Sequence, residues 1–111
     1  MEFRLSKYIA IDAKDYTKAI AFYRDTLGWQ VIEESEHETQ FKKGDATFFV
    51  ANDASSPYTI YFEYEVDDVE AAKEKLLAEG CKVWSSGKPQ SYMVKDPYGT
   101  HFHIYQKGAL L

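Results

Sequence analysis

The sequence predicts an α+β fold built from two copies of one module, each a strand, a helix and three further strands. The first observation behind this is a duplication in which three pairs of residues stand 52 or 53 positions apart: Tyr8 and Tyr61, Asp15 and Asp68, and Gly28 and Gly80. The second is that a stretch alternating with a period of two precedes a stretch with helical spacing in each copy. Half of 111 residues buries too little apolar surface to fold alone. We therefore expect one domain, residues 1–111, made of modules at about 1–52 and 57–107.

The first module begins with a strand over residues 7–12, where Ile9 and Ile11 alternate with the residues between them. Asp15 stands where a helix N-cap is expected, and apolar residues then recur at helical spacing until Gly28, which suits a left-handed C-cap. Three short strands are expected over residues 29–34, 39–43 and 46–51.

The second module repeats this order. A strand over residues 60–66 precedes Asp68, which is expected to cap a helix ending at Gly80. Strands are then expected over residues 82–84, 91–95 and 100–105, the last two joined by a tight turn that contains Pro97 and Gly99. Residues 52–57 form the linker between the modules.

Composition excludes several classes of function. The chain has 18 acidic and 13 basic residues, a formal net charge of -5, and no basic cluster, so we expect no nucleic-acid partner. Cys81 is the single cysteine, which excludes an internal disulfide framework and a zinc site built from cysteines. No apolar stretch approaches the roughly 20 residues of a membrane span, and no apolar signal core stands near the start. We expect no membrane partner and a cytoplasmic location.

Three motifs occur in order along this frame. They are the run Asp15, Lys18, Phe22, Tyr23, Leu27, Gly28 and Trp29, then the segment 66–72, and last the segment 96–103. Together they resemble the vicinal oxygen chelate superfamily, which includes glyoxalase I, bleomycin-resistance proteins, fosfomycin-resistance enzymes and extradiol dioxygenases. The resemblance covers about residues 7–106. It implies two βαβββ modules that form a cupped mixed sheet, with helices on the convex side, a ligand cavity on the concave side, and a homodimer.

The resemblance also implies where a metal would bind. Metal-dependent members hold a divalent ion with His, Gln or Glu at four strand positions that face the cup, and these positions fall on Tyr8, Phe48, Tyr61 and His103. A protonated phenol is a poor ligand for a divalent ion, and phenylalanine has no lone pair. We therefore expect no metal and no cofactor. A substitute set of His101, His103 and Glu63 is disfavoured because alternate side chains on a strand lie about 7 Å apart.

An aromatic lining is expected in place of the metal. The predicted ligand-binding residues are Tyr8, Phe48, Tyr61, Glu63, Trp84, Tyr92 and His103. Aromatic walls with a few hydroxyl groups suit flat organic molecules, and their ring faces also attract cations. Alternatively, these rings simply fill the space between the modules.

Three hypotheses on function remain open. The first is metal-independent binding or sequestration of a small aromatic or cationic organic molecule, as in bleomycin-resistance proteins. The second is a divergent enzyme, such as a lyase, isomerase or dioxygenase-like enzyme, that uses the candidate catalytic residues Glu63 and His103 with or without a divalent metal. The third is a non-catalytic regulatory or interaction module with a filled cavity. The identity of the ligand, and whether one chain or two build the cavity, are left open by the sequence.

Overall fold

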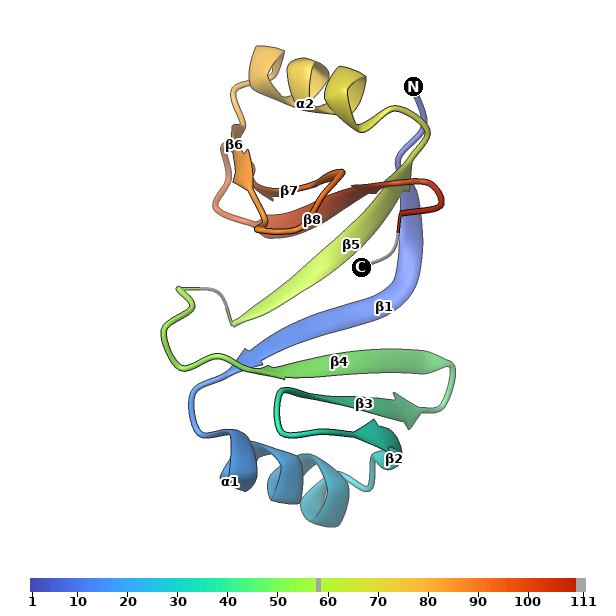
Figure 1. Ribbon diagram of the computed structural model, residues 1–111, viewed down its shortest axis with the longest axis vertical. Helices are drawn as coiled ribbons and strands as arrows, with labels where there is room; N and C mark the ends of the chain where they lie inside the picture. The colour runs from blue at the N-terminus through green and yellow to red at the C-terminus, as the bar shows by residue number, and fades with distance from the viewer. Residues whose placement is uncertain (58, 110–111) are drawn as a thin grey trace. The chain divides into compact units, whose positions relative to one another are not determined.

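The computed structural model describes residues 1–57 and 59–109. Within these residues the chain forms eight strands and two α-helices in the predicted order (Figure 1). It divides into an N-terminal unit, Lys7–Ile60, and a C-terminal unit that combines Met1–Ser6 with the chain from Tyr61 onward. The predicted α+β class, with two βαβββ modules and mixed strand pairing, is confirmed.

The N-terminal unit has the strand order β2-β3-β4-β1. β1 (Arg4–Ala13) runs parallel to β4 (Ala46–Asn52), while β3 (Glu38–Lys43) pairs antiparallel with both β4 and β2 (Gln30–Glu34). β1 begins three residues earlier than the sequence predicts, and the three later strands match the expected ranges to within one residue.

The first helix differs from its prediction at its C-terminal end. α1 (Tyr16–Ala21) begins after Asp15, whose side chain accepts a hydrogen bond from the Lys18 amide at 3.3 Å. From Phe22 to Thr26 the chain widens into a π-turn, η1 (Phe22–Thr26), in which the Leu27 amide donates to the Phe22 carbonyl at 3.1 Å. Gly28 then ends the helix with a φ of +72°, as its C-cap role predicts.

One face of the N-terminal sheet packs against α1. Its core is formed by Ile20, Phe41 and Val50, of which the last two are fully buried. Trp29 stacks between two rings, with centroid distances of 4.4 Å to Tyr23 and 4.0 Å to Phe48. We call this side of the sheet, which carries the core and the helix, the helix face.

The C-terminal unit repeats the arrangement with the strand order β5-β8-β7-β6. β5 (Ile60–Val66) is parallel to β8 (His101–Gln106), and β7 (Ser91–Lys95) pairs antiparallel with β8 and with β6 (Lys82–Ser85). α2 (Val69–Ala78) begins after Asp68, which accepts from the Ala71 amide at 3.0 Å. The helix face of this unit contains the fully buried side chains of Val66, Val94 and Ile104.

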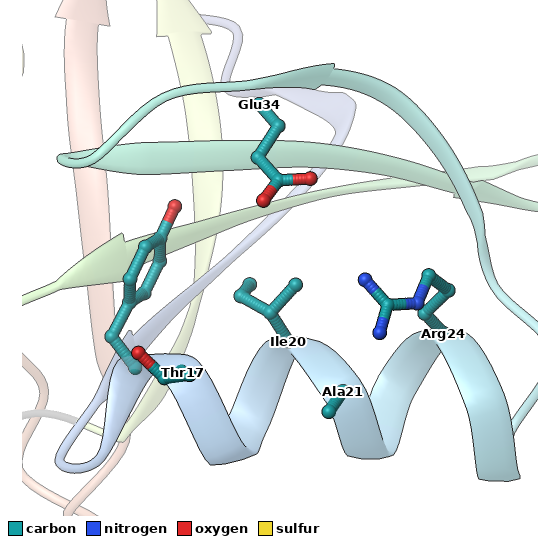
Figure 2. Close-up of a pocket in the computed structure, with 6 residues that line it drawn as sticks. Thr17, Ile20, Ala21, Arg24 and Glu34 are labelled. Atoms are coloured by element: carbon teal, nitrogen blue, oxygen red, sulfur yellow. The ribbon is translucent and has the colours of Figure 1, made fainter.

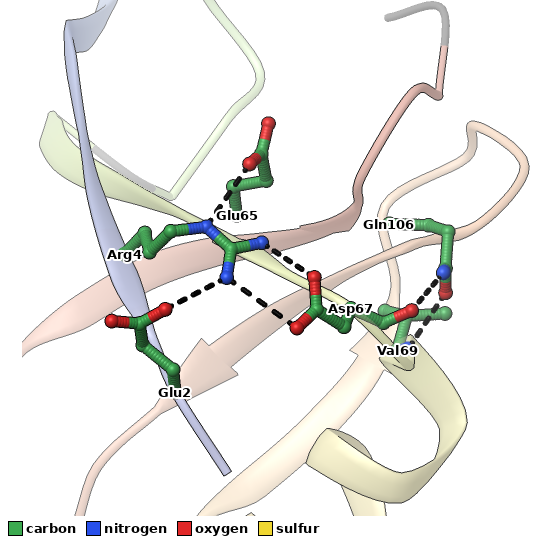
Figure 3. Close-up of polar contacts among 6 residues, drawn as sticks. All are labelled: Glu2, Arg4, Glu65, Asp67, Val69 and Gln106. Atoms are coloured by element: carbon green, nitrogen blue, oxygen red, sulfur yellow. Dashed lines mark hydrogen bonds and ion pairs between the residues drawn. The ribbon is translucent and has the colours of Figure 1, made fainter.

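The first residues of the chain are fixed to the C-terminal unit by Arg4 (Figure 3). Its guanidinium donates to Asp67 at 2.8 Å, to Glu2 at 2.9 Å and to Glu65 at 3.2 Å. The pKa of Asp67 is lowered by the hydrogen bond from Arg4. The Gln106 side chain extends this network, since it accepts from the Val69 amide at 2.8 Å and donates to the Asp67 carbonyl. These contacts explain why β1 starts at Arg4.

Candidate functional site

Each sheet has a second side, opposite its helix face, which we call the far face. Strand alternation and register assign its residues. In the N-terminal unit they include Tyr8, Ala10, Asp12, Gln30, Glu38, Gln40, Lys42, Thr47, Phe49 and Ala51. In the C-terminal unit they are Tyr61, Glu63, Glu65, Lys82, Trp84, Ser91, Met93, Lys95, His101, His103 and Tyr105. Five of the seven predicted ligand-binding residues lie on these far faces.

Phe48 is a correction, because it belongs to the helix face of the N-terminal unit, where it stacks on Trp29. Phe49 takes the far-face position instead and lies 5.0 Å from the Tyr8 ring. The prediction placed this position on Phe48 by symmetry with the second module, although two residues join β3 to β4 and five join β7 to β8. Because the two turns differ in length, the position in β4 that corresponds to His103 lies one residue later than symmetry predicts. A shift of one residue along a strand moves the side chain to the opposite face.

Tyr92 is the second correction. It lies on the helix face of the C-terminal unit, where its hydroxyl donates to Glu70 Oε1 at 2.5 Å and the Lys73 ammonium lies 4.9 Å from the ring centroid. The hydrogen bond to Glu70 raises the pKa of Tyr92. The strand occupies the predicted residues, 91–95, but its register places Met93 and not Tyr92 opposite His103 on the far face.

Glu63 and His103 are direct neighbours across β5 and β8 on the far face of the C-terminal unit. Glu63 Oε1 lies 3.8 Å from His103 Nδ1, and the two side chains are only 14% and 8% exposed. His103 Nε2 is buried and has no hydrogen-bond partner among the described residues. Leaving such an atom unpaired costs about 1 to 3 kcal/mol, so a partner supplied from outside would stabilise this arrangement.

Two aromatic contacts lie near this pair on the same face. The His103 and Tyr105 rings lie 6.1 Å apart. Trp84 opposes Met93, and its ring meets His101 edge-on at 6.4 Å although β7 runs between their strands. The indole therefore extends across β7 on the far face.

A buried Asp12–Ser56 pair was not predicted as a site. The Ser56 hydroxyl donates to Asp12 Oδ2 at 2.6 Å, and both residues are buried. Burial raises the pKa of Asp12, and the hydrogen bond from Ser56 opposes part of that rise. The Lys14 ammonium donates to the Ser56 carbonyl, and the Asp12 amide donates to the Thr59 carbonyl at 3.0 Å. Alternation places Asp12 on the same face as Tyr8, but nothing in the linker sequence identifies Ser56 as its partner.

The donor groups do not fit the divalent ion of the metal-dependent superfamily members. No group of three His, Cys, Asp or Glu side chains within residues 1–57 and 59–109 is arranged to hold a metal. Glu63 faces His103, whereas His101 lies against Trp84, so the substitute set considered above is not assembled. The equivalent positions on the other strands carry Tyr8, Phe49 and Tyr61.

A separate hollow of about 180 Å³ lies between α1 and β2 in the N-terminal unit (Figure 2). Ile20 lies between Thr17 and Arg24 along the helix, and Glu34 points toward them from β2. Arg24 is already paired with Asp25 at 2.8 Å, and the Tyr16 hydroxyl is bonded to the Ser35 carbonyl and to Thr39. Because these polar groups are satisfied and none of the predicted site residues line the hollow, we do not assign the function to it.

Comparisons with known proteins agree on the fold. A glyoxalase/bleomycin resistance protein/dioxygenase superfamily member from Vibrio splendidus 12B01 is 18% identical, with a TM-score of 0.64 over 95% of this chain and 99% of the other. Methylmalonyl-CoA epimerase from Streptomyces coelicolor is 14% identical, with a TM-score of 0.67 over 97% of each chain. Homoprotocatechuate 2,3-dioxygenase from Arthrobacter globiformis is 23% identical, with a TM-score of 0.64 over 95% of this chain and 36% of the dioxygenase.

None of the curated proteins compared with this sequence matches it. No helix among the described residues is long and apolar enough to cross a membrane. The model of the glyoxalase-like domain matches residues 8–105, which is most of the chain and includes both modules. Together with the two βαβββ modules, this match shows that the chain belongs to the glyoxalase-like family of the vicinal oxygen chelate superfamily.

Proposed function

We propose that this protein binds and sequesters a small aromatic molecule on the far face of its C-terminal unit, without a metal, and that His103 Nε2 contacts the ligand. The observation that carries the proposal is the buried Nε2 atom with no partner among the described residues. A ligand hydroxyl or carbonyl group that pairs with this nitrogen would remove a cost of about 1 to 3 kcal/mol.

The surrounding side chains support an aromatic ligand over a cationic one. Tyr61, Trp84 and Tyr105 supply ring surfaces on this face, whereas the exposed Lys82 and Lys95 would repel a cation. His103 is buried while Trp84 is 37% exposed, so we infer that a ligand enters beside Trp84. Met93 lies opposite His103 and has a flexible side chain that can turn aside.

Two neighbours in fold bind small organic molecules. Methylmalonyl-CoA epimerase from Streptomyces coelicolor was solved in complex with 2-nitronate-propionyl-CoA, and homoprotocatechuate 2,3-dioxygenase from Brevibacterium fuscum with 3,4-dihydroxyphenylacetate. They support a ligand-binding role at the level of the fold, since their identities to this chain are 14% and 18%.

A thermal-shift screen with phenols, aromatic carboxylates and aromatic amines tests the proposal. We expect at least one compound to raise the melting temperature by several degrees, because a ligand at 100 times its Kd stabilises by about 2.7 kcal/mol. His103→Gln should abolish this shift. His37→Gln is the matched control, because His37 is exposed in the β2–β3 turn, and it should leave the shift intact. No shift with any compound would favour the non-catalytic interaction module.

The Glu63–His103 pair also supports a second candidate, a metal-independent enzyme that transfers a proton. A carboxylate facing Nδ1 orients an imidazole so that Nε2 can accept a proton, as lyase and isomerase reactions require. Proton NMR in D₂O of the compounds that bind distinguishes the candidates. Loss of a C–H signal next to a carbonyl with the wild type, but not with Glu63→Gln, would indicate catalysis, while an unchanged spectrum would leave sequestration.

The homodimer and the cytoplasmic location stay predictions. The exposed side chains of Ile60 and Phe62, which are 57% and 44% accessible on the same face of β5, support a protein contact there.

A further inference from the structure

Three basic side chains form a row across the far face of the C-terminal unit. Lys82 lies directly opposite Lys95 across β6 and β7, and Lys95 lies opposite His101 across β7 and β8. Both lysines are exposed. Like charges placed directly opposite each other destabilise a sheet, so the row does not serve the stability of these strands.

Lys82 and Lys95 have no paired acidic side chain within residues 1–57 and 59–109. Asp96 follows Lys95 in the chain, but its carboxylate accepts from the Tyr98 amide at 2.9 Å and from the Thr100 amide at 3.0 Å. The row therefore presents positive charge to solvent, although the whole chain has a net charge of -5.

The basic row adjoins the proposed ligand site. Trp84, Met93 and His103 form the neighbouring row across the same three strands. Each lies two residues along its strand from the basic residue of the first row. Two residues along a strand span about 7 Å, which is close to the length of a benzene ring with a polar group at each end. Trp84 joins the two rows directly, since its ring meets the His101 ring at 6.4 Å.

We infer that the ligand of this site is a planar molecule with an anionic group, such as a carboxylate, held by Lys82, Lys95 and His101. Its ring lies against Trp84 and its opposite end points to His103. This inference rests on the proposed function and narrows it to aromatic acids. The N-terminal unit offers a contrast, because the places equivalent to Lys82, Lys95 and His101 carry Gln30, Lys42 and Thr47, with a single positive charge.

Three compounds of one shape test the inference: 4-hydroxybenzoate, its neutral analogue 4-hydroxybenzamide, and the cation 4-hydroxybenzylamine. Isothermal titration calorimetry should show the carboxylate binding about 5- to 10-fold more tightly than the amide, and the amine most weakly. This preference should weaken as the salt concentration is raised from about 20 to about 300 mM, because the Debye length falls from roughly 20 to roughly 6 Å and the exposed lysines are then screened.

The double variant Lys82→Gln, Lys95→Gln should lose most of the preference for the carboxylate and leave the affinity for the amide unchanged. Lys42→Gln is the matched control, because Lys42 occupies the equivalent strand position in the N-terminal unit, and it should change neither affinity. These exposed lysines are not part of either core, so the variants should fold.

Equal affinity for the carboxylate and the amide in the wild type would overturn the inference, as would no binding of the carboxylate. The proposed function is judged separately by His103→Gln. If other aromatic compounds still raise the melting temperature and His103→Gln removes the effect, the proposed ligand site is supported. The inference that the ligand is an anion is then wrong.

Discussion

The far faces of the two units differ much more than their helix faces do. Ile11 and Val50 of the N-terminal unit correspond to Tyr64 and Ile104 of the C-terminal unit, and all four pack in the core on the helix side. On the far face, by contrast, four apolar or neutral residues of the N-terminal unit correspond to ionisable residues of the C-terminal unit: Ala10 to Glu63, Gln30 to Lys82, Thr47 to His101, and Phe49 to His103. Two other far-face positions are ionisable in both units, since Asp12 corresponds to Glu65 and Lys42 to Lys95.

This difference suggests that the helix faces serve stability in both units, whereas the far face of the C-terminal unit serves function. Both copies keep a buried helix face because neither sheet can be stable without one. Only the C-terminal copy carries a buried imidazole with an unpaired nitrogen among the described residues, and a buried polar atom of this kind reduces stability. We interpret the N-terminal far face as structural and the C-terminal far face as the ligand site.

The largest expected effect distinguishes the two faces of β4. Phe48→Ala should reduce the free energy of unfolding by about 2 to 4 kcal/mol, because it removes one ring of the stack on Trp29. Phe49→Ala should cost less than about 2 kcal/mol, since that ring has an edge contact with Tyr8 outside the core cluster. Urea unfolding of both variants measures the difference. A greater loss for Phe49→Ala would contradict the assignment of faces.

The order of the strands and α-helices shows where sequence reasoning succeeds. The duplication, the caps at Asp15 and Asp68 and the alternating strands predicted the order of the eight strands and two α-helices, because these signals are local and each occurs twice. The resemblance to the superfamily indicated the positions of Tyr8, Tyr61 and His103, and alternation along β5 placed Glu63 on the same face as Tyr61.

Sequence reasoning failed where the answer depended on contacts across the fold. The one-residue shift that exchanges Phe48 and Phe49 comes from the unequal lengths of two turns, which internal symmetry cannot reveal. The π-turn at Phe22 and the Asp12–Ser56 pair also have no local signal. The basic row was missed because Lys82, Lys95 and His101 are separate in sequence and become neighbours only through strand register.

A second prediction tests whether the polar groups of the N-terminal far face are structural. Asp12→Ala should reduce the free energy of unfolding by about 1 to 3 kcal/mol, because it leaves the buried Ser56 hydroxyl without its acceptor. Asp12→Asn keeps an acceptor oxygen in place and should be about as stable as the wild type or more stable. Chemical unfolding at pH 7 measures both changes, and ligand binding at the C-terminal site should be unaffected.

The pH dependence of stability follows from the raised pKa of Asp12. A carboxyl group whose pKa is higher in the folded state contributes stability below its unfolded pKa, and this contribution is lost as the pH rises through the folded value. The advantage of Asp12→Asn over the wild type should therefore be absent near pH ~4 and grow above it. The opposite trend would mean that Lys14 and Ser56 stabilise the Asp12 carboxylate more than burial destabilises it.

The smallest expected effect on stability tests the comparison most directly. The double variant Glu63→Ala, His103→Phe gives the C-terminal far face the residues that the N-terminal face has at Ala10 and Phe49. Each single change leaves a buried polar group facing an apolar neighbour, whereas the double change removes both polar groups together. We expect the double variant to lie within about 1 kcal/mol of the wild type, and to be more stable than either single variant.

A double-mutant cycle in urea measures this coupling, and thermal shift with the ligands found in the screen measures the accompanying loss of binding. If the double variant unfolds more than about 2 kcal/mol more easily than the wild type, the Glu63–His103 pair is part of the structural framework. If it keeps its stability and loses the ligand, the fold does not require Glu63 and His103. The alanine and phenylalanine at the equivalent positions of the N-terminal unit would then serve the fold equally well. Selection for binding would then explain why the two copies have diverged on one face and not on the other.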